Sequence, residues 1–291
     1  MIPSSFDYHA PTSIDEAVDL LGRLGGEAKV LAGGHSLIPA MRLRLAFPGT
    51  LVDLNKIGGL SYIREEDGFL KIGAMTREAE LEHSALVQGR YPLLADAGRV
   101  IADPLVRNRG TVGGNLAHAD PANDHPAVML AYGATLVARG AGGTREIPVD
   151  DFFVGLFESA LEQGEILTEI RIPTPASGAG GAYEKLERKV GDYAVSAVAI
   201  QLTMDGDTCT AVRAATTNVS PVPMRVAGAE RAMSGKTITD EVLEEAGQAA
   251  AAEVDPSADL RGSVEYKRDL TRILFKRAAR RAMRRAKGEA S

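Results

Sequence analysis

Apolar and polar residues along the first 57 positions follow the pattern of a small unit that alternates helix and strand. Ser13 and Glu16, three positions apart, form a capping-box pair at the start of an apolar run with helical spacing. The predicted elements are a helix at 14–24, strands at 28–32 and 51–54, and a helical stretch at 37–45. Residues 1–57 are therefore expected to form a parallel βαβ unit.

A different pattern begins near residue 58. Two short apolar runs flank a Glu-Glu-Asp-Gly turn, which is typical of a hairpin. The hairpin is predicted at 62–64 and 69–72, helices at 76–86, 91–101 and 123–132, a glycine-rich loop at 110–115, and strands at 135–139 and 166–172. This mixture predicts a larger α+β unit over residues 58–175.

A third unit follows the segment Pro173–Gly181, whose Pro, Ser and Gly content is typical of a linker. Strands are predicted at 195–204 and 209–217, joined by an Asp-Gly-Asp turn, and the chain from about Met224 is predicted to be helical. Residues 176–291 are thus expected to form an antiparallel sheet followed by helices. The whole chain is predicted to have an α+β fold.

Length and composition are those of a globular protein with more than one core. The chain has 291 residues, a net charge of −6 and 45% apolar residues. Its longest near-apolar stretch, Ala127–Ala138, is too short for a bilayer-spanning helix of about twenty residues, and the first residues lack a signal-peptide pattern. The single cysteine, Cys209, excludes an internal disulfide and a cysteine-ligated iron–sulfur cluster. We expect a cytoplasmic protein that does not span the membrane.

The charge is unevenly distributed along the chain. Residues 261–291 contain eleven Lys and Arg against three Asp and Glu, so this segment carries +8 and residues 1–260 carry −14. Apolar residues at helical spacing predict a helix from Ser263 to about Lys287 with a wide cationic face. No nucleic-acid-binding motif accompanies it, and the acidic remainder would repel phosphate. A solvated face or a subunit contact is therefore expected, without nucleic acid as a partner.

Two glycine-rich segments are candidates for holding an anion. Glycines let a phosphate approach the backbone, and N–H groups at a helix start can face it. The first segment follows a predicted strand and comprises Ala32, Gly33, Gly34, His35 and Ser36; the second comprises Thr111, Val112, Gly113, Gly114 and Asn115, which add a hydroxyl and an amide as donors. Two such segments fit a pyrophosphate, although Gly-Gly pairs also occur in turns with a purely structural role.

Other cofactor motifs are weak or absent. The sequence contains no G-x-G-x-x-G, so a Rossmann dinucleotide site is not predicted. The segment Ser234–Thr237 matches only the end of a P-loop and is interpreted as a turn. His118 and His125 lie near two aspartates, but their spacing matches no metal site.

Several ordered motifs together resemble the FAD-binding subunits of the molybdenum hydroxylases, and among them the medium subunits of aerobic molybdenum-type carbon monoxide dehydrogenases. The likeness rests on the two glycine segments, on Asp120-Pro-Ala-Asn-Asp124, and on further matches from Met1-Ile-Pro3 to Gly191-Asp-Tyr-Ala194. The resemblance implies a vanillyl-alcohol-oxidase-type fold: a small βαβ subdomain, a larger α+β subdomain with FAD between them, and a C-terminal domain.

The resemblance also implies roles for individual residues. The segments 32–36 and 111–115 would hold the FAD pyrophosphate, and Asp124 the ribityl or ribose hydroxyls. Leu167, Lys185 and Tyr193 would lie along the flavin. Each of these three has a structural alternative: Leu167 as strand core, Lys185 as a surface lysine, and Tyr193 as a packing residue. His35 is interpreted as a turn-stabilising residue rather than a proton carrier, and no catalytic residue is assigned.

The implied function is electron transfer within a complex. A molybdenum-cofactor large subunit would oxidise the substrate, a [2Fe-2S] small subunit would relay electrons, and this chain would pass them from FAD to an external acceptor such as a quinone. A dimer of heterotrimers is expected, at the inner face of the membrane. Carbon monoxide is the expected substrate. Purines, aldehydes and N-heterocycles remain alternatives, as do a self-sufficient flavin oxidase and a non-catalytic assembly protein.

Overall fold

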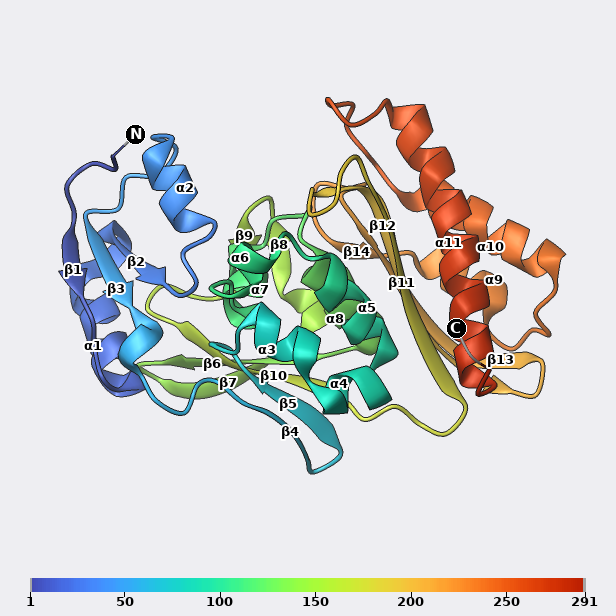
Figure 1. Cartoon of the computed structure of the whole chain (residues 1–291), viewed down its shortest axis with the longest axis horizontal. Helices are drawn as coiled ribbons and strands as arrows, with labels where there is room; N and C mark the ends of the chain where they lie inside the picture. The colour runs from blue at the N-terminus through green and yellow to red at the C-terminus, as the bar shows by residue number, and fades with distance from the viewer. Residues whose placement is uncertain (1, 290–291) are drawn as a thin grey trace.

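Three larger sheets and one two-stranded ribbon follow one another along the chain in the computed structural model, which describes residues 2–289 (Figure 1). The first sheet is parallel, with strand order β1-β3-β2. Its unit comprises β1 (Asp7–His9), α1 (Ile14–Leu24), β2 (Ala28–Leu31), α2 (Leu37–Arg42) and β3 (Thr50–Asp53), with single 3₁₀ turns at Gly25–Glu27 and Leu54–Lys56. The predicted βαβ unit is confirmed.

Helix α1 begins as the sequence predicts. The Ser13 hydroxyl accepts a hydrogen bond from the Glu16 N–H at 3.2 Å, which satisfies one of the free N–H groups of the first turn. The Glu16 carboxylate, however, accepts from the Thr12 N–H at 2.8 Å rather than from that of Ser13. The Glu16 carboxylate therefore binds the N–H of the residue before the N-cap, whereas a standard capping box uses the N–H of the N-cap itself.

The second sheet is antiparallel throughout, with strand order β4-β5-β10-β6-β7. Its strands are β4 (Ile63–Glu66), β5 (Phe69–Gly73), β6 (Thr135–Gly140), β7 (Gly143–Pro148) and β10 (Ile166–Pro173); β8 (Phe153–Gly155) and β9 (Glu158–Ser159) form the ribbon after a 3₁₀ turn at Val149–Asp151. Its helices are α3 (Glu78–His83), α4 (Ala85–Arg90), α5 (Pro92–Val100), α6 (Pro104–Arg107), α7 (Val112–His118) and α8 (Asp124–Tyr132).

Two predictions for this unit are wrong. The single helix expected at 76–86 is divided into α3 and α4, because Ser84 is extended and its hydroxyl caps α4 by accepting from the Val87 N–H. The loop expected at 110–115 is a helix start from Val112 onward, with Thr111 as the N-cap. Glycines at the second and third helical positions disguise that helix in the sequence.

The third sheet is an antiparallel meander covered by helices. It runs β11-β12-β13-β14, with strands β11 (Ala179–Glu187), β12 (Ala194–Asp205), β13 (Thr208–Thr217) and β14 (Met224–Arg225), followed by α9 (Ala227–Met233), α10 (Asp240–Glu253) and α11 (Val264–Ala286). The expected linker at 173–181 is shorter than predicted, since β11 begins at Ala179. The chain from Met224 also starts with a short strand rather than a helix.

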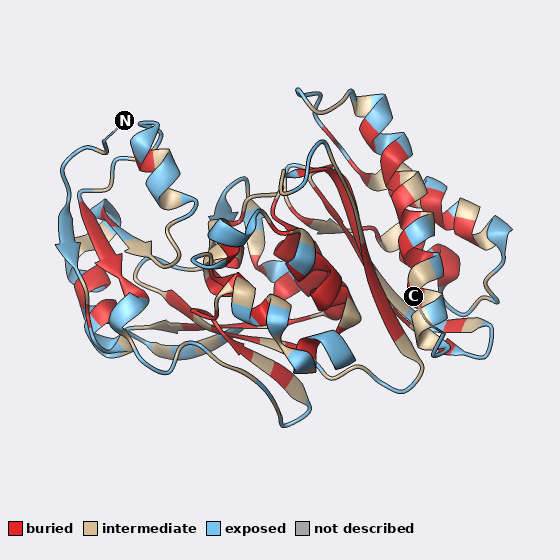
Figure 2. Cartoon of the chain, viewed as in Figure 1, coloured by how far each residue is buried: buried red, intermediate tan, exposed pale blue. Residues whose placement is uncertain are grey.

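Both faces of this third sheet are buried (Figure 2). Alternate residues of β12 point to opposite sides: Ala197 and Ala199 belong to the core of the middle unit, while Val198 and Ile200 belong to a second core under the C-terminal helices. Helices α5 and α8 cover one face and α11 the other (Figure 1). This burial explains the near-continuous apolar run that marks β12 in the sequence.

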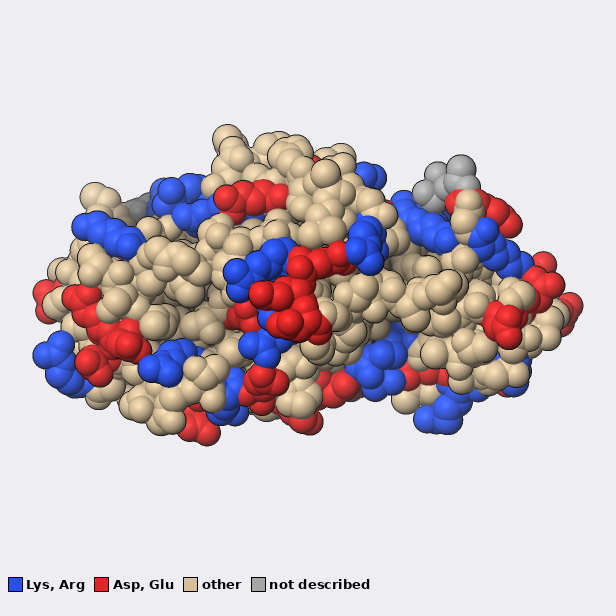
Figure 3. Space-filling model, turned by 90° about the horizontal axis from the view of Figure 1, so that it is seen from below, with Lys and Arg blue, Asp and Glu red and all other residues tan. Residues whose placement is uncertain are grey.

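Most cations of the basic C-terminal segment are paired with carboxylates. Nine of its eleven cations lie within 4.0 Å of a carboxylate among the described residues, namely Arg261, Lys267, Arg268, Arg272, Lys276, Arg280, Arg281, Arg285 and Lys287. Figure 3 likewise shows cationic and anionic groups intermixed on one face of the molecule. Within residues 2–289, no helix is long and apolar enough to cross a bilayer.

Candidate functional site

The first glycine segment offers free backbone N–H groups. It follows β2, and Gly34 has a φ of +78°, a conformation that favours glycine. The Asn55 side-chain amide donates to the Ala32 carbonyl at 2.9 Å and fixes the start of the segment. Within residues 2–289, the N–H groups of residues 33–36 have no acceptor. A ligand with several oxygens would satisfy them.

A pocket of about 590 Å³ opens beside this segment. It is lined by Gly33, Gly34, His35, Ile38, Pro39, Arg42, Leu43 and Arg109. Its volume is within the usual range for small-molecule and cofactor sites. Two guanidinium groups and the free N–H groups make it suited to an anion, while the α2 side chains add an apolar wall.

The second glycine segment contributes side chains rather than backbone donors. The N–H groups of Val112 and Gly113 donate to the Thr76 and Ala74 carbonyls at 3.0 and 2.9 Å, and that of Gly114 donates to the Thr111 hydroxyl at 3.1 Å. This segment therefore offers fewer free N–H groups to an anion than the first one does. The side-chain oxygen of Asn115 is buried without a partner in the described chain and remains available to a ligand.

The two glycine segments are in direct contact. A Cβ atom on Gly33 would lie 2.4 Å from the Arg109 carbonyl oxygen, and one on Gly114 would lie 3.5 Å from the Ala32 Cβ. Arg77 reinforces the contact, because its guanidinium donates to the Arg109 carbonyl and to the Asn55 side chain, both at 2.5 Å. The chain thus brings together two segments separated by about eighty positions.

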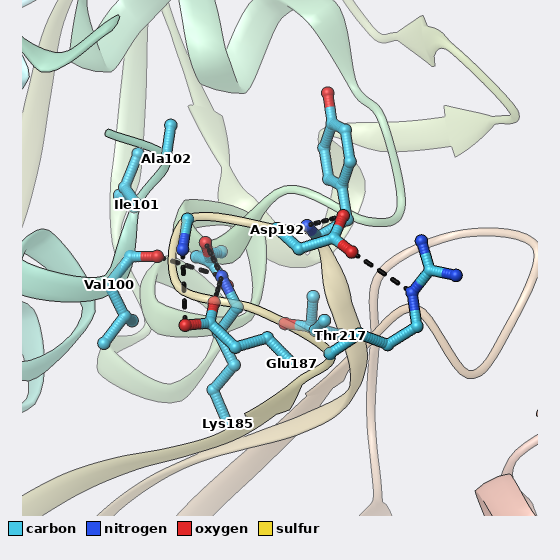
Figure 4. Close-up of polar contacts among 12 residues, drawn as sticks. Val100, Ile101, Ala102, Lys185, Glu187, Asp192 and Thr217 are labelled. Carbon is cyan, nitrogen blue, oxygen red and sulfur yellow. Dashed lines mark hydrogen bonds and ion pairs between the residues drawn. The ribbon is translucent and has the colours of Figure 1, made fainter. Parts of the chain in front are cut away.

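Asp124 and Lys185 form a buried ion pair at the next part of the site. The Lys185 ammonium lies 3.0 Å from the Asp124 carboxylate and donates to the Val100 carbonyl at 3.0 Å (Figure 4). The Tyr183 hydroxyl donates to the other Asp124 oxygen at 2.6 Å. Burial raises the pKa of Asp124, and the charge of Lys185 opposes that rise. Lys185 is 3% exposed and is not a surface lysine.

A short contact connects this pair to the glycine segments. The Asn123 side chain donates to the Asn115 carbonyl at 2.9 Å, which places the start of α8 against α7. Tyr193 is 45% exposed. Partial burial raises the pKa of its hydroxyl, and the carboxylates of Asp120 and Asp124 raise it further. Asn115 and the Asp124–Lys185 pair are therefore neighbours in the structure.

Leu167 and the histidines differ in how far they are buried and in what they contact. Leu167 lies on β10, is 5% exposed and packs in the core of the middle unit. His35 is exposed in the turn before α2. His125 is fully buried, 2.7 Å from the Glu78 carboxylate, whereas His118 packs against the Phe157 ring. Ser234–Thr237 forms a turn after α9, as expected.

Sequence reasoning missed three residues that organise the site: Asn55, Arg77 and Tyr183. Asn55 follows Asp53 at the end of a buried strand, a position where polar residues signal function. Tyr183 alternates with core residues along β11 and gives no separate signal. Arg77 acts across 22 and 32 positions of sequence, which no local pattern shows.

Comparison with known proteins identifies the family. Residues 4–175 match the model for the FAD binding domain in molybdopterin dehydrogenase, and residues 181–282 match the CO dehydrogenase flavoprotein C-terminal domain. The chain belongs to this flavoprotein family. As a molybdopterin dehydrogenase flavoprotein, it has the fold that the resemblance implied, and FAD is the cofactor of its family.

Individual relatives match along almost the whole chain. The carbon monoxide dehydrogenase medium chain of Hydrogenophaga pseudoflava is 49% identical over 278 residues, which cover 96% of this chain and 97% of the relative. A solved structure of carbon monoxide dehydrogenase from that organism has a TM-score of 0.96 at 50% identity, covering 98% of this chain and 99% of the other. Quinoline 2-oxidoreductase from Pseudomonas putida 86 has a TM-score of 0.93 at 32% identity, covering 98% and 99%. The relatives include medium subunits of multi-subunit dehydrogenases.

The residues present fit FAD. The N–H groups of residues 33–36 and the Arg109 guanidinium suit a pyrophosphate, and the unpartnered Asn115 oxygen suits a hydroxyl or amide of the cofactor. The buried Asp124 carboxylate, already polarised by Lys185, is an acceptor for sugar hydroxyls. Bound FAD supplies two-electron redox chemistry, and the protein holds and orients it.

Proposed function

We propose that this chain is the FAD-carrying electron-transfer subunit of a molybdenum hydroxylase complex that oxidises carbon monoxide to carbon dioxide. The observation that carries the proposal is the contact between the two glycine segments beside a pocket with free N–H groups and two arginines. That arrangement suits a dinucleotide pyrophosphate, and nothing in the site suggests a base or nucleophile for a separate substrate.

Each site residue has a proposed role toward FAD. Ala32, Gly33, Gly34, His35 and Ser36 bind the pyrophosphate through backbone N–H groups, and Thr111, Val112, Gly113, Gly114 and Asn115 close the opposite side through packing and the Asn115 amide. Asp124 accepts hydrogen bonds from ribityl or ribose hydroxyls. Lys185 and Tyr193 lie beside the flavin, and Leu167 supports that end from the core. None of these residues is proposed to transfer a proton.

Electrons must enter from another polypeptide. The chain has one cysteine, whereas an iron–sulfur cluster requires several thiolates. We therefore propose a molybdenum-cofactor large subunit, a [2Fe-2S] small subunit and an external acceptor such as a quinone, assembled as a dimer of heterotrimers. The single cysteine also favours the cytoplasm, at the inner face of the membrane where a quinone is accessible.

The choice of carbon monoxide rests on similarity, since identity is higher to the carbon monoxide dehydrogenase chain than to quinoline 2-oxidoreductase. The substrate pocket lies in another subunit under this proposal. Purines, aldehydes and N-heterocycles are therefore the substrates to test next.

Purification from the native host through an affinity tag on this chain tests the subunit assignment. We expect two partner polypeptides, molybdenum, iron and one FAD per copy of this chain. A chain isolated without partners, whose flavin is reduced by a small organic donor, would instead identify a self-sufficient oxidase. A complex without flavin would indicate an assembly protein.

A further inference from the structure

The segment between β11 and β12 carries Tyr193 and has a tightly specified shape. Gly191 has a φ of +81°, and a Cβ atom there would lie 2.9 Å from the Ala102 carbonyl oxygen. The Asp192 carboxylate accepts from the N–H of Tyr193 at 2.8 Å. The backbone before Tyr193 is therefore packed against the chain after α5, and Asp192 fixes the backbone N–H of Tyr193.

Arg261 reaches this segment from a distant part of the chain. Its guanidinium donates to the Asp192 carboxylate at 2.8 Å and lies 5.8 Å from the centre of the Tyr193 ring, within cation–π range. The Asp192 and Arg261 side chains are 9% and 23% exposed, so water competes weakly with this pair.

Arg261 is itself held in place by its neighbours. The backbone N–H of Arg261 donates to the Asp259 carboxylate at 2.7 Å, and the Lys267 ammonium lies 2.9 Å from the same carboxylate. Lys267 is only 2% exposed and also donates to the Ser257 carbonyl. A chain of charged contacts thus extends from the first turns of α11 to Asp192.

The opposite side of the segment contacts the ion pair at the candidate flavin site. The Gly191 N–H donates to the Glu187 carboxylate at 3.3 Å, and Glu187 lies 3.4 Å from the Lys185 ammonium. Arg188 also contacts Asp192, at 3.3 Å, but half of its side chain is exposed. The better-buried contact that directs Tyr193 is the one from Arg261.

We propose that Arg261 is a positioning residue that orients Tyr193 toward the flavin through Asp192. The inference rests on the proposed FAD function. It assigns to the connection between α10 and α11 a role in the site, although that connection contains none of the residues predicted to bind the cofactor. Arg261 acts through Asp192 and Tyr193 and need not contact the cofactor.

Flavin fluorescence of the complete complex tests this role. A tyrosine ring against a flavin quenches its emission, so Tyr193→Leu sets the emission expected without the ring. We expect Arg261→Ala to raise emission per bound FAD to that level, with little further rise in the double variant. The FAD dissociation constant should rise about tenfold, since hydrogen bonds between charged groups contribute on that order. Arg261→Lys should restore part of the quenching.

Arg268→Ala is the matched control, because Arg268 is half-exposed and 4.0 Å from Asp255. It should leave emission unchanged. Hydrogen–deuterium exchange over residues 188–193 should rise in Arg261→Ala and not in the control. Unchanged emission in Arg261→Ala or in Tyr193→Leu, with FAD still bound, would overturn the inference even if exchange rises. A wild-type complex that contains no FAD would overturn the proposed function instead.

Discussion

Gly33 shows how a single residue can join two segments of the site. The position of its missing Cβ is 2.4 Å from the Arg109 carbonyl oxygen and 2.8 Å from the Gly110 Cα, both backbone atoms that cannot rotate away. We expect Gly33→Ala to separate the segments and to weaken FAD binding at least about tenfold, because overpacking costs about 1–3 kcal/mol. Isothermal titration of the deflavinated complex with FAD measures this.

Gly22 provides the control for that substitution. It lies inside α1, with nothing within 4 Å of its Cβ position. Gly22→Ala should stabilise the chain by about 0.5–1 kcal/mol and leave FAD binding unchanged. Wild-type affinity in Gly33→Ala would contradict the assigned contact.

Cys209 is predicted to be an unreactive thiol. It is buried on β13, and burial raises its pKa to about 11. Because the thiolate is the reactive form, alkylation at pH 8 should be slow in the native chain and fast after unfolding. Mass spectrometry of iodoacetamide-treated protein gives the labelled fraction. Rapid labelling of the folded chain would exclude this burial.

At the residue scale, the sequence predicted which residues form the candidate site, but not which hydrogen-bond partners their backbone groups have. Gly33 and Gly114 were identifiable because each lies in a glycine pair within a motif of the family that the chain resembles. That the N–H groups of Val112 and Gly113 bind the Thr76 and Ala74 carbonyls could not be predicted, since this depends on contact with a segment about forty positions earlier.

Helix α11 is fastened to the middle unit by a buried aspartate on α5. Asp96 is 5% exposed and accepts from Arg281 at 2.9 Å, from Arg285 at 2.6 Å and from the Tyr183 N–H at 3.2 Å. This cluster connects three elements, and Tyr183 in turn contacts Asp124. Two of the basic residues of α11, Arg281 and Arg285, thus form ion pairs within the chain.

Removal of that carboxylate should destabilise the chain strongly. We expect Asp96→Ala to lower the free energy of unfolding by about 3 kcal/mol, because two arginines lose a buried partner. Asp240→Ala, which removes a largely exposed partner of Arg280, should cost about 1 kcal/mol or less. Urea unfolding compares the two variants. Equal losses of stability in the two variants would show that the buried Asp96 cluster contributes no more than an exposed ion pair.

The contact between Arg261 and Asp192 should show a defined pH dependence. The hydrogen bond from Arg261 lowers the pKa of Asp192 to about 2 from its usual 3.8. A carboxylate with a lowered folded pKa stabilises the fold above its unfolded pKa, and this contribution is lost as the pH falls from about 4 toward 2. The stability difference between wild type and Asp192→Asn should therefore be constant from pH 7 to 5 and shrink below pH 4. A difference independent of pH down to 3 would contradict this.

At the element scale, elements whose apolar pattern reports burial were predictable, and exposed elements were not. Strand β1 is exposed along its whole length, so it has no apolar alternation to reveal it. The alternating pattern of α1 and the continuous apolar run of β12 were clear because packing fixes both. Helix α7 was missed because its first turn contains two glycines that pack closely against neighbouring segments.

At the scale of the whole molecule, three hydrophobic cores correspond to the three sheets. We propose domains at 1–57, 58–175 and 176–291, in line with these cores. The middle and C-terminal units are not packed independently of each other, because Tyr183 and Ala197 of the third sheet pack into the core of the middle unit. The candidate site residues are distributed over all three units, so cofactor binding depends on their relative placement.

We propose that this chain holds an FAD that is reduced by electrons from carbon monoxide, which is oxidised in a partner subunit. The most direct test is the absorbance spectrum of the native complex before and after anaerobic addition of carbon monoxide. Bleaching of the flavin bands is the predicted result, and it requires cofactor, electron route and substrate together. A complex whose spectrum contains no flavin would contradict the proposed FAD function, while an oxidised flavin that carbon monoxide leaves unbleached would contradict carbon monoxide as the substrate.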